Sequence, residues 1–214
     1  GGIGGVYGII AMKEARRTPI RSIAVDRDVR FLLHFTQAAN LTGIVKHGLW
    51  PRRDLAAADH LAYASDYGRL DGNEDAVSVS ISRVNGPMFA AKRRKSGHVD
   101  WIVLVLSATI LWTHDCRFCW RNAARNEVKN HRGYCGGPWA FAQMFAGGEE
   151  ERRDLAPHFS TDPEAEVQVL QPIEADHIHG AIVGQPGLAE PVRAIRNGLS
   201  GRLRQVEFQD FGLV

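Results

Sequence analysis

The most regular hydrophobic pattern in the chain is the alternation of apolar and polar residues over 75–82, DAVSVSIS. Such period-two alternation predicts a β-strand with one buried face. Runs over 30–35 (RFLLHF) and 101–107 (WIVLVLS) also have strand length, and the continuous hydrophobicity of the second indicates a strand covered on both faces. Later strands are expected over 164–171, 178–183 and 202–208.

A helical pattern follows the first of these strands. Thr36 offers a side-chain oxygen where the helix is expected to begin, and Gly48 is the expected end. Between them apolar residues recur at helical spacing: Ala38, Leu41, Ile44 and Val45. Shorter helices are expected over 120–128, 138–146 and 189–197. Polar stretches over 52–75 and 147–163 predict long connections, the first of them mobile.

The strands are scattered among short helices, which predicts an α+β fold, because a doubly wound sheet would alternate strands and helices regularly. The 214 residues, 44% of them hydrophobic, suffice for a single domain, which we place over residues 30–214. The start, GGIGGVYGIIAM, has neither a signal-peptide pattern nor a βαβ setting for its glycines. Residues 1–29 are therefore interpreted as a flexible, tag-like leader and N-terminal extension.

Charge changes this picture only locally. A net charge of +2 does not by itself indicate a polyanion partner, but Lys92, Arg93, Arg94 and Lys95 form one basic run. A solvated loop is the ordinary explanation of such a run, and contact with phosphates is the alternative. No apolar stretch is long enough to cross a bilayer, which predicts a soluble protein without membrane contact.

The three cysteines are an odd number without a secretory context, which favours reduced thiols in the cytoplasm. Cys116 and Cys119 have zinc-knuckle spacing, and His114, His131 and Cys135 are nearby in the sequence as completing ligands. Because a second close pair is missing, no metal is expected.

Two polar patterns lie within predicted strands. STDPEAEV, residues 160–167, places Glu164 and Glu166 in alternation with apolar residues, and an exposed sheet face explains this without catalysis. His34 and Thr36 are two apart on an extended segment, so they project to one face and could hold a polar ligand. A helix cap at Thr36 and a hydrogen-bonded core histidine are the structural alternative.

Five stretches in order bear on these alternatives: HFTQAANLTGIVKHGLWPR (34–52), RLDG (69–72), SVSISRVNGPMF (78–89), CRFCWRNAA (116–124) and TDPEAEV (161–167). They resemble the ordered motifs of the DarT family, the DNA ADP-ribosyltransferase toxins of toxin–antitoxin systems. The resemblance covers most of the chain from about residue 30 onward. It implies an ADP-ribosyltransferase fold, with split antiparallel sheets around a cleft for NAD and short peripheral helices.

The resemblance also implies which residues bind NAD, the co-substrate. The His-x-Thr stretch of His34, Phe35 and Thr36 would hold the nicotinamide end. Gly43, in the following helix, and Pro51 would line the same pocket.

The family's essential arginine falls on Arg69 and its essential glutamate on Glu166. Cleaving the bond between ribose and nicotinamide builds positive charge on the ribose, which a fixed carboxylate can stabilise. The same carboxylate can take a proton from the attacking base, and Arg69 would neutralise the diphosphate or orient the carboxylate. Glu164 stands where many relatives carry glutamine, a difference that could alter how the adjoining loop handles the base.

Single-stranded DNA is the implied acceptor, because a base must leave a duplex stack to reach a buried glutamate. The proposed DNA contacts are Arg83, Lys92, Arg93, Arg94, Lys95 and Phe159, with Phe89 and Trp120 as further rings that could stack on bases. The segment 152–161 resembles the family's substrate-recognising loop. SISRVNGPMF and CRFCWRNAA look more like the branch that modifies guanosine than the branch that modifies thymidine.

The sequence therefore predicts a monomeric toxin that transfers ADP-ribose from NAD to a base in DNA and blocks replication, in phage defence or growth control. Its expected partner is a cognate DarG-like antitoxin, a macrodomain ADP-ribosylglycohydrolase. Two alternatives stay open: the same fold acting on RNA or protein, and a non-catalytic nucleic-acid-binding module stabilised by zinc on Cys116, Cys119 and Cys135.

Overall fold

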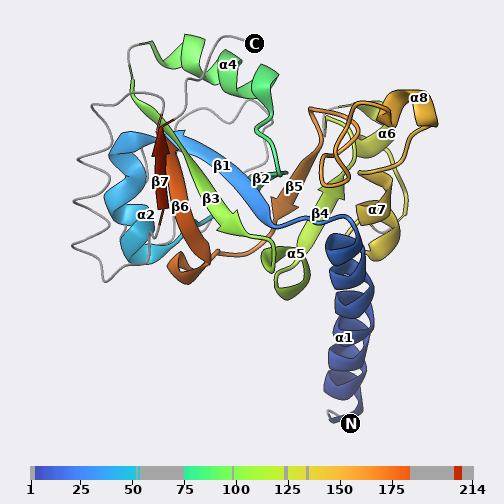
Figure 1. Cartoon of the computed structure of the whole chain (residues 1–214). Helices are drawn as coiled ribbons and strands as arrows, with labels where there is room; N and C mark the ends of the chain where they lie inside the picture. The colour runs from blue at the N-terminus through green and yellow to red at the C-terminus, as the bar shows by residue number, and fades with distance from the viewer. Residues whose placement is uncertain are drawn as a thin grey trace.

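A computed structural model describes residues 3–51, 53, 75–97, 99–122, 125–133, 135–183 and 205–208 (Figure 1). Seven strands of this part of the chain form one sheet in the order β4-β5-β2-β1-β3-β6-β7. The strands are β1 (Phe31–Gln37), β2 (Val77–Ile81), β3 (Trp101–Ser107), β4 (Cys116–Cys119), β5 (Glu166–Val169), β6 (Ile178–Val183) and β7 (Gln205–Phe208). Each predicted strand is confirmed. The connection expected over 52–75, apart from Arg53 and Asp75, and the helix expected over 189–197 lie outside the described residues.

The sheet is split between β1 and β2. β1 pairs with β3 along its whole length, but it pairs with β2 at only two positions, Leu32↔Ile81 and Leu33↔Ser80. The rest of β2, Val77 to Val79, pairs with β5. In Figure 1, β1, β3, β6 and β7 lie on one side of this split and β4 and β5 on the other. All pairs are antiparallel except the edge pair β6–β7, which is parallel and departs from the expected antiparallel arrangement.

Helices cover both parts of the sheet. They are α1 (Ile3–Asp26), α2 (Leu41–His47), α4 (Gly86–Ser96), α5 (Ile110–Thr113), α6 (Asn126–Lys129), α7 (Pro138–Gln143) and α8 (Glu149–Arg152), with 3-10 turns η1 (Ala38–Asn40) and η3 (Ala175–His177). α2 and α4 lie over the half that contains β1 and β3, and α6, α7 and α8 lie beside β4 (Figure 1). Mixed helices and a mainly antiparallel sheet confirm the α+β prediction.

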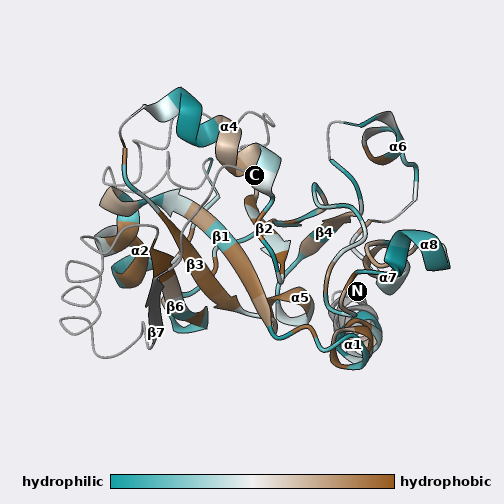
Figure 2. Ribbon diagram, turned by 45° about the horizontal axis from the view of Figure 1, so that its top comes forward, coloured by the Kyte–Doolittle hydropathy of each residue, from teal (hydrophilic) through white to brown (hydrophobic). Residues whose placement is uncertain are grey.

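β3 is covered on both faces, as its continuous hydrophobicity predicted. Ile102 and Leu104 belong to the main core, while Trp101 and Val103 form a second cluster with Phe89 beneath α4. Figure 2 shows β1 and β3 as mainly apolar, and α4 as polar toward its C-terminal end. The half of the sheet that contains β3 is therefore packed on both faces.

The interpretation of residues 1–29 as a flexible leader is wrong. Residues 3–26 form α1, and its second half inserts Ile20 and Ala24 into the main core, where both are buried. Val29 is buried with them before β1 begins. The glycines near the start of the chain give this segment a low helix propensity, so the helix was not predicted from the sequence. In proteins, most of the stability of a helix comes from packing and not from propensity.

Asn85, Gly86 and Pro87, residue types that are typical of a turn, cap and begin the helix α4. The Asn85 side chain accepts a hydrogen bond from the Met88 amide at 3.1 Å, and Pro87 lies in the first helical turn, where its missing N–H costs nothing. The helix expected at Thr36 begins differently, with η1 and without any side-chain cap. Among the described residues, no helix combines the length and apolar character needed to cross a bilayer.

Candidate active site

Glu166 is buried at the split in the sheet. It begins β5, and only 2% of its surface is exposed, although the alternating pattern had suggested an open polar face. Its Oε2 accepts a 2.5 Å hydrogen bond from Ser78 Oγ, and its Oε1 accepts one of 2.9 Å from Gln168 Nε2. β5 is paired at both edges, with β4 and β2, and all four of its residues are buried, so the carboxylate must be satisfied by such partners.

His34 reaches the same place from β1. Its Nδ1 lies 2.8 Å from the carbonyl oxygen of Ser78, and because a carbonyl only accepts, Nδ1 carries the hydrogen. The backbone pairing of β1 with β2 ends at Leu33↔Ser80, so the imidazole connects the two strands where they diverge. Ser78 thus links His34 through its backbone and Glu166 through its hydroxyl.

Next to this pair, one buried acceptor has no partner. Gln168 Oε1 has no hydrogen-bond partner among the described residues, although Gln168 is only 2% exposed. A buried amide oxygen without a donor is unusual in a folded protein and marks a position where a ligand donor would be favourable. Neither Ser78 nor Gln168 was proposed as a site residue from the sequence, although the alternation of β2 and β5 placed both on the polar faces of these strands.

The other residues proposed for NAD are distributed unequally. Thr36 is buried on the same face of β1 as His34 and accepts a 3.2 Å hydrogen bond from Asn40 Nδ2. Phe35 points to the opposite face and packs beneath α4, so its side chain does not join His34 and Thr36. Gly43 is half-buried in α2 and Pro51 is buried after it, while Arg69 lies outside the described residues.

The basic run is helical, not a solvated loop. All four residues lie in α4; Lys92 is placed over the Phe35 ring at 5.4 Å and Arg93 over the Phe89 ring at 5.5 Å. Arg94 and Lys95 are exposed. Two of the four charges are therefore positioned by aromatic faces, and two point to solvent.

An ordered loop precedes β5. Arg152 Nη1 donates to Phe159 O and Thr161 Oγ1, both at 2.9 Å, and its Nη2 donates to Ala156 O at 3.3 Å. Burial lowers the pKa of the Arg152 guanidinium, as do Arg27 and Arg83 nearby. Arg152 therefore ties together several residues of the segment 152–161, which lies shortly before Glu166.

Arg83 joins this loop to the end of β2. Its Nη2 donates to Ser160 O at 2.7 Å, and its guanidinium lies over the Phe159 ring at 5.3 Å. Burial lowers the pKa of Arg83, and its buried Nε has no hydrogen-bond partner among the described residues. Two of the residues proposed for DNA binding, Arg83 and Phe159, are therefore brought into direct contact.

A second aromatic group lies beyond β4. Trp139 is 54% exposed and stacks on His131 at 5.2 Å with an interplanar angle of 9°, while Trp120 meets both rings edge-on. Cys119, the residue before Trp120, pairs with Glu166 across the sheet. The exposed Trp139 was not proposed from the sequence, because an aromatic residue in a short helix is usually part of the core.

Glu164 is paired with the segment that follows β4. Its two carboxylate oxygens lie 3.4 Å from Asn122 Nδ2 and 3.5 Å from Arg125 Nη2. Its side chain is 28% exposed, so Glu164, unlike Glu166, is not enclosed. The two glutamates that look alike in the sequence thus have different surroundings.

The three cysteines do not form a zinc site. Cys116 and Cys119 are three apart on β4 and so point to opposite faces, and all three thiols are buried without a disulfide. Among the described residues, the one group with metal-ligand geometry contains no cysteine. The zinc-stabilised alternative loses its proposed ligands.

The described part of the chain is a split, mainly antiparallel sheet with a buried glutamate on β5 and a histidine on β1, on the two sides of the split, and its fold matches that of DarT ADP-ribosyltransferase structures. The family described as "ssDNA thymidine ADP-ribosyltransferase, DarT" matches residues 33–210, and this chain belongs to that family. Members of this family are NAD-dependent transferases that act on single-stranded DNA. The resemblance inferred from the five motifs is confirmed.

Solved structures support the same fold. DarT from Thermus sp. 2.9 in complex with NAD⁺ has a TM-score of 0.58 and 17% identity, over 85% of this chain and 96% of that one. The same protein with ADP-ribosylated ssDNA has a TM-score of 0.56 and 18% identity, over 86% and 95%. Thermosipho africanus DarTG in complex with ADP-ribose has a TM-score of 0.53 and 15% identity, over 86% of this chain. This chain spans about half of that DarTG chain, 51%. A comparison with curated proteins found no match.

Proposed function

We propose that this chain transfers ADP-ribose from NAD to a nucleobase in single-stranded DNA and releases nicotinamide. The observation that carries the proposal is the buried carboxylate of Glu166, held by Ser78 and Gln168 and linked through Ser78 to His34. Structures of a DarT relative with NAD⁺ and with ADP-ribosylated ssDNA support the choice of both substrates.

In this proposal, the bond between the ribose C1′ and the nicotinamide nitrogen breaks, and a bond from C1′ to a base nitrogen forms. Positive charge develops on the ribose as nicotinamide departs with the bonding electrons, and the Glu166 carboxylate stabilises it. The base nitrogen loses one proton, which Glu166 accepts. Ser78 and Gln168 fix the carboxylate beforehand, so no reorganisation is needed during the reaction.

The NAD-binding residues in the proposal are His34, Thr36, Gly43, Pro51 and Arg69. A ribose hydroxyl or an amide N–H is a suitable donor for the unpartnered Gln168 Oε1. Phe35 is left out of this set, because its ring packs against Phe89 and Trp101 on the face of β1 opposite His34 and Thr36. Arg69 keeps its proposed task of neutralising the diphosphate or orienting Glu166.

DNA is proposed to follow the positive groups next to the loop before β5. Arg83 and Phe159 form a cation–π pair there, and Arg94 and Lys95 on α4 add exposed charge. A cation and an aromatic face side by side suit a single strand, since phosphates contact the charge and bases stack on rings. Binding should weaken as salt is added.

The family description and the motifs of this chain point to different acceptor bases. The family description names thymidine, whereas two motifs of this chain favour guanosine, which we propose as the acceptor to be tested against thymidine. The biological proposal is a monomeric cytoplasmic toxin that blocks DNA replication, in phage defence or growth control, and is opposed by a DarG-like antitoxin.

The test is incubation of the purified chain with labelled NAD and single-stranded oligonucleotides of each base composition. The proposal expects label on DNA, release of nicotinamide, and loss of both in Glu166→Ala. Base analysis of the product identifies the acceptor. Label on RNA or protein alone would move the proposal to another acceptor, and DNA binding without nicotinamide release would reject it.

A further inference from the structure

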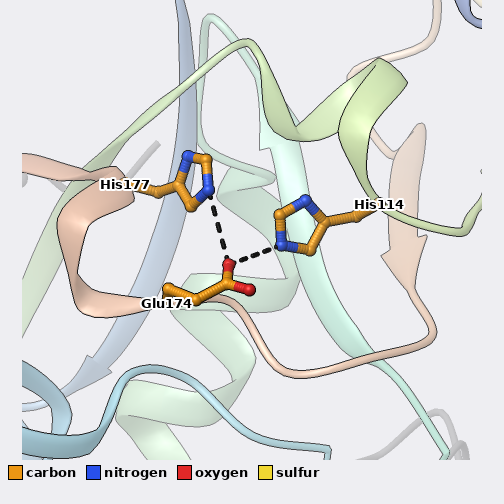
Figure 3. A group of neighbouring side chains, drawn as sticks. All are labelled: His114, Glu174 and His177. Carbon is orange, nitrogen blue, oxygen red and sulfur yellow. Dashed lines mark hydrogen bonds and ion pairs between the residues drawn. The ribbon is translucent and has the colours of Figure 1, made fainter.

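Three side chains outside the candidate active site meet at one point (Figure 3). His114 follows α5, Glu174 precedes η3, and His177 is the last residue of η3. We propose that His114, Glu174 and His177 bind a divalent transition-metal ion such as Zn²⁺ through two imidazole Nε2 atoms and one carboxylate oxygen.

The distances suit this assignment. Glu174 Oε2 lies 2.8 Å from His114 Nε2 and 3.4 Å from His177 Nε2, and the three ligand atoms lie within 4.8 Å of one another. Tetrahedral Zn²⁺ with bonds of about 2.0–2.1 Å separates its ligand atoms by about 3.3 Å. The His177–Glu174 spacing already matches this value, and a small opening of the His114–Glu174 contact admits the ion.

The hydrogen bonds of His114 imply that a cation, either a proton or a metal ion, lies between His114 and Glu174. Thr113 Oγ1 donates its only hydrogen to Thr109 O at 2.8 Å, so its 2.9 Å contact with His114 Nδ1 must be donated by Nδ1. A neutral His114 then directs the lone pair of Nε2 at a carboxylate oxygen 2.8 Å away. Two acceptors at that distance need a proton or a metal ion between them.

The surroundings match those of metal-binding histidines. His177 Nδ1 lies 3.4 Å from Thr109 Oγ1, so both rings have a threonine hydroxyl at the nitrogen opposite the proposed metal.

Exposure gives the ion a route from solvent. The His114 side chain is 4% exposed and the Glu174 side chain 63%, so the carboxylate is the open side of the site. Three protein ligands leave a fourth position for water. Zn²⁺ is favoured over Mg²⁺ or Ca²⁺ because two of the three ligands are imidazoles, which the hard cations disfavour.

A bound ion would fasten the connection before β4 to the connection after β5. Backbone hydrogen bonds already join Leu170 to Asp115 and Ile173 to Leu49 in this region, each at 2.8 Å. The expected consequence is stabilisation of the folded chain by the metal, independent of NAD or DNA.

The experiment is a titration of the metal-free full chain with Co²⁺ and Zn²⁺, followed by absorption spectroscopy and thermal unfolding. We expect one ion per chain, cobalt d–d bands without a thiolate charge-transfer band, and a higher Tm with metal. Glu174→Gln and His177→Gln should each weaken binding by about tenfold or more. His179→Gln, a nearby histidine outside the group, is the control and should bind as the parent does.

Two results would overturn the proposal. One is the absence of stoichiometric binding by the folded parent chain, which would leave a proton as the cation between His114 and Glu174. The other is binding that the Glu174 and His177 substitutions do not change. Circular dichroism of each variant establishes that it is folded, and Glu174→Gln is the decisive variant because its side chain is largely exposed.

Discussion

Ser78 donates its hydroxyl hydrogen to the buried carboxylate of Glu166 over 2.5 Å. The carbonyl oxygen of the same serine accepts the Nδ1–H of His34. One residue of β2 therefore orients a group on β5 and a group on β1, on the two sides of the split in the sheet.

Removing the Ser78 hydroxyl should lower activity without unfolding the chain. A hydrogen bond to a charged group contributes about 1.5–3 kcal/mol, so Ser78→Ala is expected to reduce kcat about ten- to a hundredfold. Ser78→Thr keeps the hydroxyl and should restore most of the rate. Steady-state nicotinamide release measures both, and equal rates for Ala and Thr would show that the hydroxyl has no role in orienting Glu166.

Glu166→Gln should abolish transfer and leave the fold intact. The glutamine oxygen can accept from Ser78, and its NH₂ can donate to the unpartnered Oε1 of Gln168 once that amide rotates. Loss of a group that stabilises charge and accepts a proton is expected to cost about 10²- to 10⁴-fold in rate. Thermal unfolding should give a Tm close to that of the parent, and Glu164→Gln, at the partly exposed neighbour, is the matched control.

Arg152→Ala should release the loop before β5. Its guanidinium donates to Phe159 O, Thr161 Oγ1 and Ala156 O, so the substitution removes three hydrogen bonds within the loop. We expect a loss of about 2 kcal/mol in the free energy of unfolding and faster proteolysis between residues 152 and 161. We also expect the substitution to raise the KM for DNA more than it raises the KM for NAD. Arg153→Ala is the control. A loop that resists protease equally in both variants would contradict this role of Arg152.

Gly48→Ala should destabilise the chain by about 2 kcal/mol or more. Gly48 has φ +87°, and an added Cβ would lie 2.3 Å from Ile173 O, next to the Leu49–Ile173 bridge. Gly86→Ala, where an added Cβ meets nothing within 4 Å, should change stability little. Urea unfolding of the two variants checks the difference, which would be absent if the end of α2 could move away from residue 173.

Cys116 should resist thiol reagents while the chain is folded. Burial, and to a smaller extent Asp115, raise the pKa of its thiol from 9.0 to about 12. The folded chain therefore holds one more proton than the unfolded chain between these pH values, and stability falls there by about 1.4 kcal/mol per pH unit. Alkylation followed by mass spectrometry should label Cys116 only after denaturant is added. Labelling of native protein near pH 8 would contradict its enclosure.

Local sequence patterns predicted the secondary structure better than they predicted which side chains are buried. The alternation over 75–82 and the apolar run over 101–107 became β2 and β3, because a two-residue period fixes strand geometry directly. The same reasoning predicted that Glu166 would be exposed, because alternation alone does not show whether the polar face of a strand is covered by other parts of the chain. α1 was missed because what stabilises it, the burial of Ile20 and Ala24, involves partners that are distant in the sequence.

By itself the sequence determined every strand of the described sheet except β4, the α+β class, the His-x-Thr pair and, through its ordered motifs, the family. These depend on residue spacing, which the chain carries locally. The tertiary structure alone decided that His34 and Glu166 share Ser78, that Phe35 turns away beneath α4, and that His114 meets Glu174 and His177 instead of the cysteines. The physical reason is that strand pairing and helix packing bring together side chains that are distant in the sequence, such as Ser78 and Glu166 at 88 positions apart, and no local period encodes which of them will meet.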